Sequence, residues 1–272
     1  MARTVTWLHL SDLHACPKKN GWDSDTIIES LKNDLDKLKE RYQPDLIFFT
    51  GDAAHGDRAE CGALDEQNEV AALFFLGLLD LYPDLSADRF FLVPGNHDVD
   101  RDEVGDPMRE WLENSKRDAG GIAEMLAQKD RNWRECMKRL HGYQKMLESL
   151  DLDHLNQDPD RLCYHQTVSI HGVVVGIAGL NSAWSCGRKE EKGKLWLGGE
   201  WQIKTLHNKV KSSDLTIALT HHPFGWFTPS EEKASKKRLQ TSFDLHLHGH
   251  EHQGWFNVQE EDRRWNQKTH VL

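Results

Sequence analysis

Short polar motifs recur along this chain, and most of them directly follow a short apolar run. In chain order they are Asp12-Leu13-His14, Gly51-Asp52, Gly95-Asn96-His97-Asp98, His221-His222-Pro223 and Gly249-His250-Glu251-His252. Aspartate, asparagine and histidine supply the oxygen and nitrogen ligands that suit Mn, Fe, Zn or Mg. One such motif alone is weak evidence, but the whole set in this order predicts a hydrolytic site built around two metal ions.

The apolar runs predict the strands of an α/β fold. The runs that read as strands are Val5–Leu10, Leu46–Thr50, Phe90–Val93, Val173–Leu180, Leu215–Thr220 and the shorter Phe243–Leu247. Apolar residues at helical spacing predict helices over Ile27–Leu38, Val70–Leu81 and Gly199–Val210, the first with a capping box at Thr26 and Glu29. Strands that alternate with helices imply right-handed crossovers and a mostly parallel sheet.

Residues 101–155 interrupt this alternation with a charged segment that reads as helical. One apolar stripe runs through it, formed by Trp133, Met137, Leu140, Gln144 and Leu147. Two interpretations stay open: a helical insertion that caps the site, or connecting helices packed on the sheet. The length of 272 residues suits a single large α/β domain, residues 1–272, that contains this segment.

Charge, hydropathy and cysteine usage exclude several classes of protein. The net charge of −10 argues against extensive nonspecific binding to duplex phosphates. No apolar stretch has the length of a signal peptide or of a membrane span. Five scattered cysteines predict free thiols in a reducing, cytoplasmic environment: Cys16, Cys61, Cys136, Cys163 and Cys186.

The ordered set Asp-x-His, Gly-Asp, Gly-Asn-His-Asp, His and Gly-His-x-His resembles the calcineurin-like metallophosphoesterase superfamily. The resemblance extends from residue 6 to about residue 258, and every expected ligand is present. It implies an α/β sandwich of mostly parallel central sheets flanked by helices. It also implies two divalent metal ions, with Mn expected first and Fe, Zn or Mg as alternatives.

The C-terminal residues Thr269-His270-Val271-Leu272 read as the beginning of another strand. Members of the superfamily usually carry at least one more strand after the last histidine motif. We therefore expect a truncated C-terminus, and the chain resembles the N-terminal module of a larger bacterial protein with further C-terminal domains.

The resemblance also assigns metal ligands. Seven residues would hold the ions: the shared Asp52, then Asp12, His14 and His252 at one ion, and Asn96, His221 and His250 at the other. A bridging carboxylate suits two dications about 3.5–4 Å apart, because it reduces their repulsion. One residue of register decides between His221 and His222, and the family pattern favours His221.

Catalytic roles follow from the same resemblance. His97 would protonate the leaving group or stabilise the phosphoryl oxygens, without binding metal. Asp98 would hydrogen-bond to His97 and favour its charged form, or else serve as a turn or helix N-cap residue. Two metals lower the pKa of a bridging water, so hydroxide near neutral pH would attack phosphorus in line without a covalent enzyme intermediate.

Residues near the motifs favour a phosphodiester substrate. Protein phosphatases of the superfamily carry Gly-Asp-x-Val-Asp-Arg-Gly and Gly-Asn-His-Glu, whereas this chain has Gly-Asp-Ala-Ala-His-Gly and the Asn-His-Asp form of the phosphodiesterase and nuclease branches. Candidate substrate contacts are Arg101 for phosphate, Trp226 or Phe227 for stacking on a nucleobase, and Asn181 and His222. For each of them a purely structural role is the alternative.

We therefore expect a dinuclear-metal phosphodiester hydrolase, and in its leading version a nuclease that acts on DNA or RNA. A phosphodiesterase for cyclic nucleotides or other small molecules is the alternative. A non-catalytic scaffold is less favoured, because scaffolds on this fold generally lose ligands and this chain keeps them.

Overall fold

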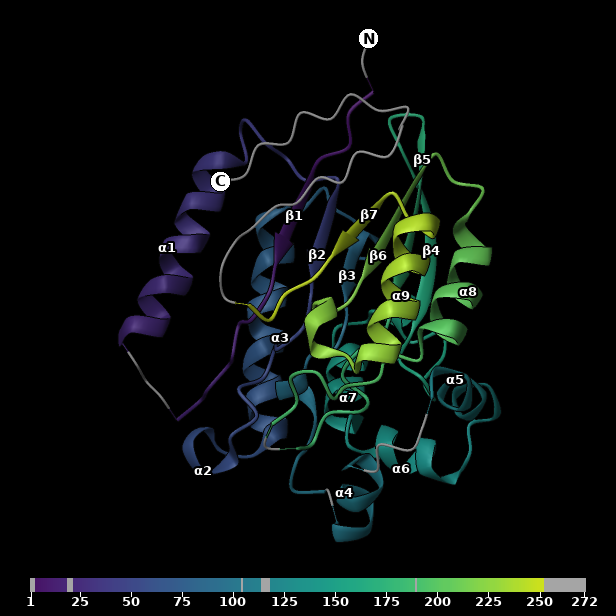
Figure 1. The fold of residues 1–272 in the computed structure, drawn as a ribbon. Coiled ribbons are helices and arrows are strands. Elements are labelled where there is room, and N and C mark those ends of the chain that lie inside the picture. The colour runs from purple at the N-terminus through teal and green to yellow at the C-terminus, as the bar shows by residue number, and fades with distance from the viewer. Residues whose placement is uncertain (1–2, 19–21, 104, 114–117, 189, 252–272) are drawn as a thin grey trace.

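The computed structural model describes residues 3–18, 22–103, 105–113, 118–188 and 190–251, and within them two sheets lie between helices (Figure 1). The first sheet has the parallel order β1 (Trp7–Leu10), β2 (Leu46–Phe49), β3 (Phe90–Leu92). The second has the order β4 (Tyr164–Ile170), β5 (Val173–Gly179), β6 (Leu215–Leu219), β7 (Leu245–Leu247), in which only β4 is antiparallel to its neighbour. The predicted α/β sandwich of mostly parallel sheets is confirmed.

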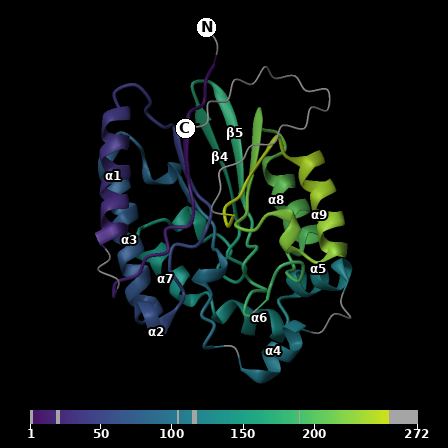
Figure 2. The same cartoon turned by 60° about the vertical axis from the view of Figure 1, so that its left-hand side comes forward.

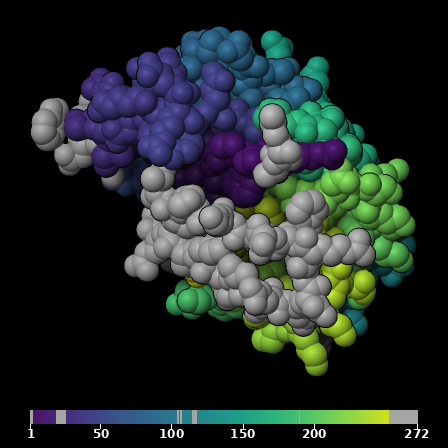
Figure 3. Space-filling model, turned by 90° about the horizontal axis from the view of Figure 1, so that it is seen from above, coloured from purple at the N-terminus to yellow at the C-terminus, as the bar shows by residue number. Residues whose placement is uncertain are grey.

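Helices in the crossovers cover the outer sides of the sheets (Figure 2). On the side of the first sheet lie α1 (Trp22–Leu38) and α3 (Leu64–Leu81), with the short α2 (Arg58–Cys61) before α3. On the side of the second sheet lie α8 (Gly199–Val210) and α9 (Pro229–Ser242), which pack on each other. Seen from above, the darkest purple N-terminal residues lie between the blue helices of one side and the green and yellow elements of the other (Figure 3).

All six strands predicted between residues 5 and 247 are present, and one strand was missed; the strand beginning predicted at residues 269–272 lies outside the described residues. The sequence Tyr164–Ile170 mixes polar and apolar residues because it forms an outer strand, β4, whose side chains alternate between core and surface. Helix α1 begins at Trp22, so the predicted capping box at Thr26 and Glu29 is wrong: these residues lie inside the helix. Helices α3 and α8 end at Leu81 and Val210, as predicted.

Residues 101–155 form four helices with η3 (Asp153–Leu155): α4 (Asp106–Glu113), α5 (Ala119–Gln128), α6 (Arg131–Lys138) and α7 (His141–Ser149). Helix α7 packs on α3, and α5 packs on α8. Between α6 and α7 the fully buried Arg139 donates hydrogen bonds to the carbonyl oxygens of Trp184 and Cys186. These helices therefore share the main core and hold the loop that follows β5.

Two of the five cysteines are not free thiols, which corrects the prediction. Cys16, after β1, and Cys61, in α2, form a disulfide across 45 residues of sequence. Cys136, Cys163 and Cys186 are free and buried. The pairing depends on the approach of two distant segments, which cysteine spacing does not reveal. Within the described residues no helix has the length and apolar character needed to cross a membrane.

Candidate metal centre

The segments that leave β1, β2, β3, β6 and β7 bring the polar motifs together at one edge of the two sheets. Asp12 lies two residues after β1, Asp52 three after β2, Asn96 four after β3, His221 two after β6 and His250 three after β7. All five strands belong to parallel pairs. The carboxyl ends of such strands are where open α/β sheets bind ligands, so the fold itself assembles the site.

Four candidate ligands adopt a left-handed backbone, with φ of 60° at Asp12, 50° at His14, 58° at Asp52 and 77° at His250. Only eight non-glycine residues in the described part of the chain have positive φ, so half of them are candidate ligands. Such conformations cost on the order of 1–3 kcal/mol each and persist where the surrounding structure holds them. Hydrogen bonds of 3.0 Å from the amides of Asp12 and His14 to the carbonyls of residues 51 and 52 supply that support.

Glycine is required at two positions beside the ligands, because ligand side chains lie too close to the glycine backbone to leave room for a Cβ atom. Gly51 has a φ of 93°, and a Cβ there would lie 2.6 Å from Nδ1 of His221. A Cβ on Gly95 would collide with the carboxylate of Asp52. The glycines of the Gly-Asp and Gly-Asn-His-Asp motifs therefore create the space that these ligands occupy.

One group of donor atoms surrounds Nε2 of His221. This nitrogen lies 3.2 Å from Oδ2 of Asp52, 3.1 Å from Oδ1 of Asn96 and 3.0 Å from Nδ1 of His250. Donors bound to one ion at about 2.0–2.2 Å lie roughly 3–3.5 Å from each other, so the spacing fits a single metal ion. Nδ1 of His221 contacts the carbonyl of Thr50 at 2.6 Å, which directs Nε2 to the site.

A second group shares the same Asp52 oxygen. Nε2 of His14 lies 3.9 Å from Oδ2 of Asp52 and 3.8 Å from Oδ1 of Asp12. Asp52 thus stands between the two groups, where a bridging carboxylate would stand. The predicted ligand His252 lies outside the described residues. The oxygen and nitrogen donors of both groups suit Mn, Fe, Zn or Mg.

Asp52 and His221 are buried together, at 1% and 0% exposure. Burial by itself would lower the pKa of His221, but the Asp52 carboxylate outweighs it and raises that pKa to about 9. Burial likewise opposes ionisation of Asp52, yet His221 holds the Asp52 pKa well below its ordinary value. Without metal the two side chains form an ion pair, so a metal ion must displace the proton of His221.

Asp98 does not hydrogen-bond to the His97 ring, which corrects the predicted role. Its carboxylate accepts hydrogen bonds from the backbone amides of Asp52 at 3.1 Å, Ala54 at 2.9 Å and Gly95 at 2.7 Å. Burial, and then the charge of Asp52, raise the Asp98 pKa to about 7. Asp98 therefore links the segment after β2 to the segment after β3. This is the turn role that the sequence predicted as the alternative for Asp98.

His97 is oriented by a backbone carbonyl. Its Nδ1 donates to the oxygen of His55, and its amide donates to Oδ1 of Asp52 at 2.8 Å. The ring lies edge-on to that of His14, with centroids 4.7 Å apart. This arrangement leaves Nε2 as the ring nitrogen available to a substrate. The role of His55 could not be predicted from the sequence, because a contact made by a backbone carbonyl has no side-chain signature.

A pocket of about 450 Å³ opens beside the donor atoms. Its lining consists of Asn96, His97, Arg101, Glu190, Glu191, Lys192, Lys194, Trp226 and His250. Arg101 and Trp226, two of the residues predicted to contact substrate, both line this pocket. Arg101 lies 3.4 Å from the Glu191 carboxylate, and the Trp226 ring meets His250 edge-on at 4.0 Å between centroids. The loop of residues 190–194 was not singled out from the sequence, because it carries no local motif.

Three other predicted substrate contacts do not reach this pocket. Phe227 is 2% exposed and packs in the core. Asn181 is fully buried, and its side-chain oxygen accepts from the amides of residues 183 and 184. His222 is fully buried against Ser182, whose hydroxyl accepts from the amides of His221 and His222 and lies 3.0 Å from Nδ1 of His222. Phe227 thus belongs to the core, and Asn181 and His222 lie in hydrogen-bond networks with the backbone near the site.

Mn²⁺ affinity is expected to rise with pH up to about 9, the pKa of His221. Below this value each ion bound by the His221 group releases one proton, so affinity should increase roughly tenfold per pH unit. Isothermal titration calorimetry in buffers of different ionisation enthalpy measures the released proton. Affinity that does not change between pH 7 and 9 would contradict the Asp52–His221 ion pair.

Asp52→Asn is expected to lose both ions together, whereas Asp12→Asn should lose mainly one. The reason is that Asp52 Oδ2 contacts both donor groups, while Asp12 belongs with His14. The measurement is the metal content per chain of each variant after Mn loading and desalting, determined by mass spectrometry of the metal. Full metal occupancy in Asp52→Asn would contradict the assignment of Asp52 as the ligand shared by both ions.

Comparison with known proteins places these features in a family. Residues 5–254 match the family described as calcineurin-like phosphoesterase. An uncharacterised metallophosphoesterase-like protein of Bacillus subtilis (strain 168), YydB, is 26% identical over 260 residues, which cover 93% of this chain and 50% of that protein. This chain therefore spans about half the length of that relative.

Two solved structures resemble the chain at low identity. They are an NAD nucleotidase of Haemophilus influenzae (15% identity, TM-score 0.48, 93% of this chain and 39% of that one) and a dimetal phosphatase from Danio rerio (12% identity, TM-score 0.49, 92% and 82%). The family match, by contrast, covers nearly the whole chain and includes all the described ligand motifs. The chain therefore belongs to the calcineurin-like phosphoesterase family of metal-dependent phosphoester hydrolases.

Proposed function

We propose that this chain hydrolyses phosphodiesters with two divalent metal ions, Mn first among them, and that polynucleotides are its leading substrate class. The observation that carries the proposal is the pair of donor groups sharing Asp52, placed beside a pocket that combines cations with one aromatic ring. The cations and the ring are Arg101, Lys192, Lys194 and Trp226.

The charge of the pocket favours a diester over a monoester. Three cationic side chains line it, but Glu190 and Glu191 line it too. Glu190 lies 3.6 Å from Lys194, and Glu191 lies 3.4 Å from Arg101. The paired charges leave little excess positive charge for a dianionic monoester, whereas a diester carries a single negative charge. The missing protein-phosphatase signature supports the same choice.

The chemistry divides between the ions and His97. When bound, the two ions supply Lewis-acid activation of the phosphoryl group and of a water. His97 supplies the proton for the leaving-group oxygen from Nε2, because its Nδ1 is engaged by the His55 carbonyl. Asp52 holds the His97 amide through Oδ1, so the same carboxylate positions the acid and stands between the donor groups.

Trp226 is the surface for a nucleobase in this proposal. The half-buried ring lines the pocket, and its contact with His250 fixes its position relative to the donor atoms. Single-stranded or end-accessible substrates are favoured, because a chain of net charge −10 offers no extended phosphate-binding face. Stacking on an aromatic side chain requires an unpaired base.

A small cyclic phosphodiester is the second candidate. The pocket volume of about 450 Å³ suits a small ligand, since such pockets measure roughly 300–1,000 Å³. One ring and a few cations are also enough for a single nucleotide. The two candidates share the metal chemistry and differ in whether contacts extend beyond one nucleotide.

With Mn²⁺, bis-p-nitrophenyl phosphate is expected to react faster than the monoester p-nitrophenyl phosphate, because the pocket suits a monoanion. Among biological substrates, single-stranded DNA or RNA should react faster than duplex DNA. Initial rates over this panel, with cyclic nucleotides included, decide between the candidates. Activity restricted to cyclic nucleotides would exclude the nuclease version, and faster monoester hydrolysis would exclude the diester preference.

His97→Ala is expected to keep its metal and to lose about 10²–10⁴-fold in turnover, the usual contribution of a general acid. The loss should be smaller with a nitrophenol leaving group, which needs little protonation. His171→Ala is the control, because that exposed side chain lies in the turn between β4 and β5. If His97→Ala empties the site of metal, His97 is a ligand and the role of acid belongs elsewhere.

A further inference from the structure

The short helix η4 (Phe224–Trp226) carries two aromatic rings, and each ring faces a lysine. Nζ of Lys192 lies 6.0 Å from the Trp226 ring centroid, and Nζ of Lys236 lies 5.8 Å from the Phe224 ring centroid. The lysines come from different elements, the loop before α8 and the middle of α9. The same pairing of ring and ammonium group thus occurs at both ends of η4.

The two pairs lie at increasing distance from the donor atoms. Trp226 touches His250 and lines the metal pocket, whereas Phe224 packs against His246 of β7 at 5.1 Å between centroids and is not among the residues that line the pocket. Between them Gly225 is exposed, and a Cβ there would meet nothing within 4 Å. The surface between the two rings is therefore open.

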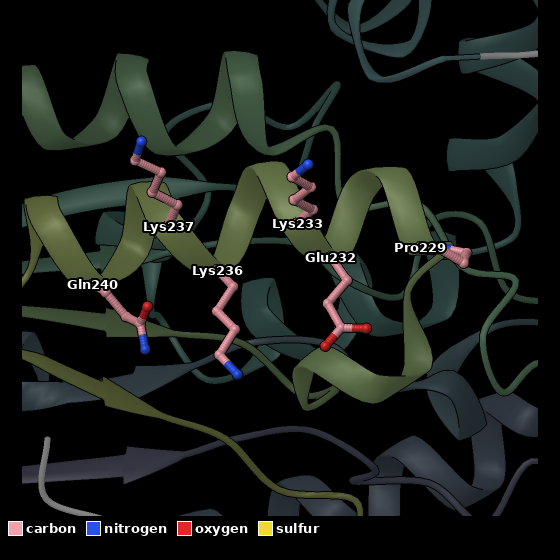
Figure 4. A pocket seen from close by; sticks show the side chains of 6 residues that line it. All are labelled: Pro229, Glu232, Lys233, Lys236, Lys237 and Gln240. Carbon is pink, nitrogen blue, oxygen red and sulfur yellow. The ribbon is translucent and has the colours of Figure 1, made fainter.

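Helix α9 directs one of its lysines to this surface. Figure 4 shows Lys236, with Glu232 and Gln240, on one side of α9, and Lys233 and Lys237 on the other. These side chains border a shallow hollow of about 340 Å³ along the helix. Of the lysines at this hollow, Lys236 is the one given a contact with the Phe224 ring, and Lys237 lies on the other side of the helix.

Both lysines keep their charge available. Among the described residues, neither Lys192 nor Lys236 forms an ion pair, although the chain carries 44 acidic and 34 basic side chains. Each ammonium group lies over its ring, and a nucleotide of a single strand fits such a pair when its base displaces the ammonium group from the ring face and its phosphate meets the displaced cation. Two such units follow each other along η4.

We propose that η4 is a two-nucleotide platform for a single-stranded polynucleotide. Trp226 and Lys192 hold the nucleotide beside the reacting phosphate, and Phe224 and Lys236 hold the next nucleotide away from the metal centre. The platform rests on the proposed function, because it names the flanking contacts of a polynucleotide whose phosphodiester is cleaved. It adds that chain length beyond a dinucleotide contributes to binding.

The test compares Lys236→Ala with Lys237→Ala, a matched lysine on the same helix that points to the other side (Figure 4). Cleavage of oligothymidylates of two and eight nucleotides is measured with Mn²⁺ over a range of salt concentrations. Lys236→Ala should raise KM for the octamer and reduce the dependence of log KM on log salt by about 0.7, the value for one phosphate contact of a single strand. Lys237→Ala should behave as the unchanged protein.

Phe224→Leu tests the stacking half of the platform. It should raise KM for the octamer about tenfold, in keeping with the loss of one stacked base, and change KM for the dinucleotide much less. Thermal unfolding by circular dichroism shows that each variant is folded, and hydrolysis of bis-p-nitrophenyl phosphate shows that its metal site is intact. Affinity for a labelled octamer, from fluorescence anisotropy, provides a readout that does not depend on turnover.

The outcomes separate the platform from the proposed function. The unchanged protein is the reference for both variants. If it cleaves the octamer, and both Phe224→Leu and Lys236→Ala cleave the octamer with the KM of the unchanged protein, the platform is wrong and the nuclease function stands. Equal effects of Lys236→Ala and Lys237→Ala also overturn the platform, since they indicate a general effect of charge. If the unchanged protein hydrolyses bis-p-nitrophenyl phosphate but neither binds nor cleaves the octamer, the nuclease function fails and the platform with it.

Discussion

The buried carboxylate of Asp52 is the group around which the site is organised. One oxygen lies near both His14 and His221, and the other accepts the amide of His97. An isolated carboxylate at 1% exposure would be costly to bury. Here the charged His221 offsets that cost in the absence of metal, and a dication can replace the proton. The same interaction therefore makes metal binding dependent on pH.

Backbone hydrogen bonds hold Asp52 in its left-handed conformation. Asp98 accepts the Asp52 amide together with those of Ala54 and Gly95, so one buried side chain joins the segments after β2 and β3. The segments after β1 and β2 remain paired beyond the strands, through the amides of Asp12 and His14. The strained conformations at the ligands persist because these bonds fix each segment. The disulfide between Cys16 and Cys61 adds a covalent link between the segment after β1 and α2.

The two sides of the site differ in character. The ligand side is buried at its centre, where Asp52 and His221 are 1% and 0% exposed. The substrate side is formed by a loop and by η4, and its charged residues Arg101, Glu190 and Glu191 partly neutralise each other. A family defined by its ligands can therefore act on many phosphoesters, because the residues that select the substrate lie on different segments from those that bind metal. In the function proposed for this chain, that selection depends on Trp226, Lys192 and the residues beside them.

The sequence alone determined six of the seven described strands, their parallel arrangement and the candidate ligands, because each described ligand follows an apolar run and strand ends meet at one edge. It could not determine what depends on contacts between distant segments. Asp98 bonds to three amides instead of His97, Phe227 and Asn181 are buried, and Cys16 pairs with Cys61. A local pattern states which residue types are present and at what spacing. Only tertiary packing decides which way a loop side chain points and which backbone groups it must satisfy.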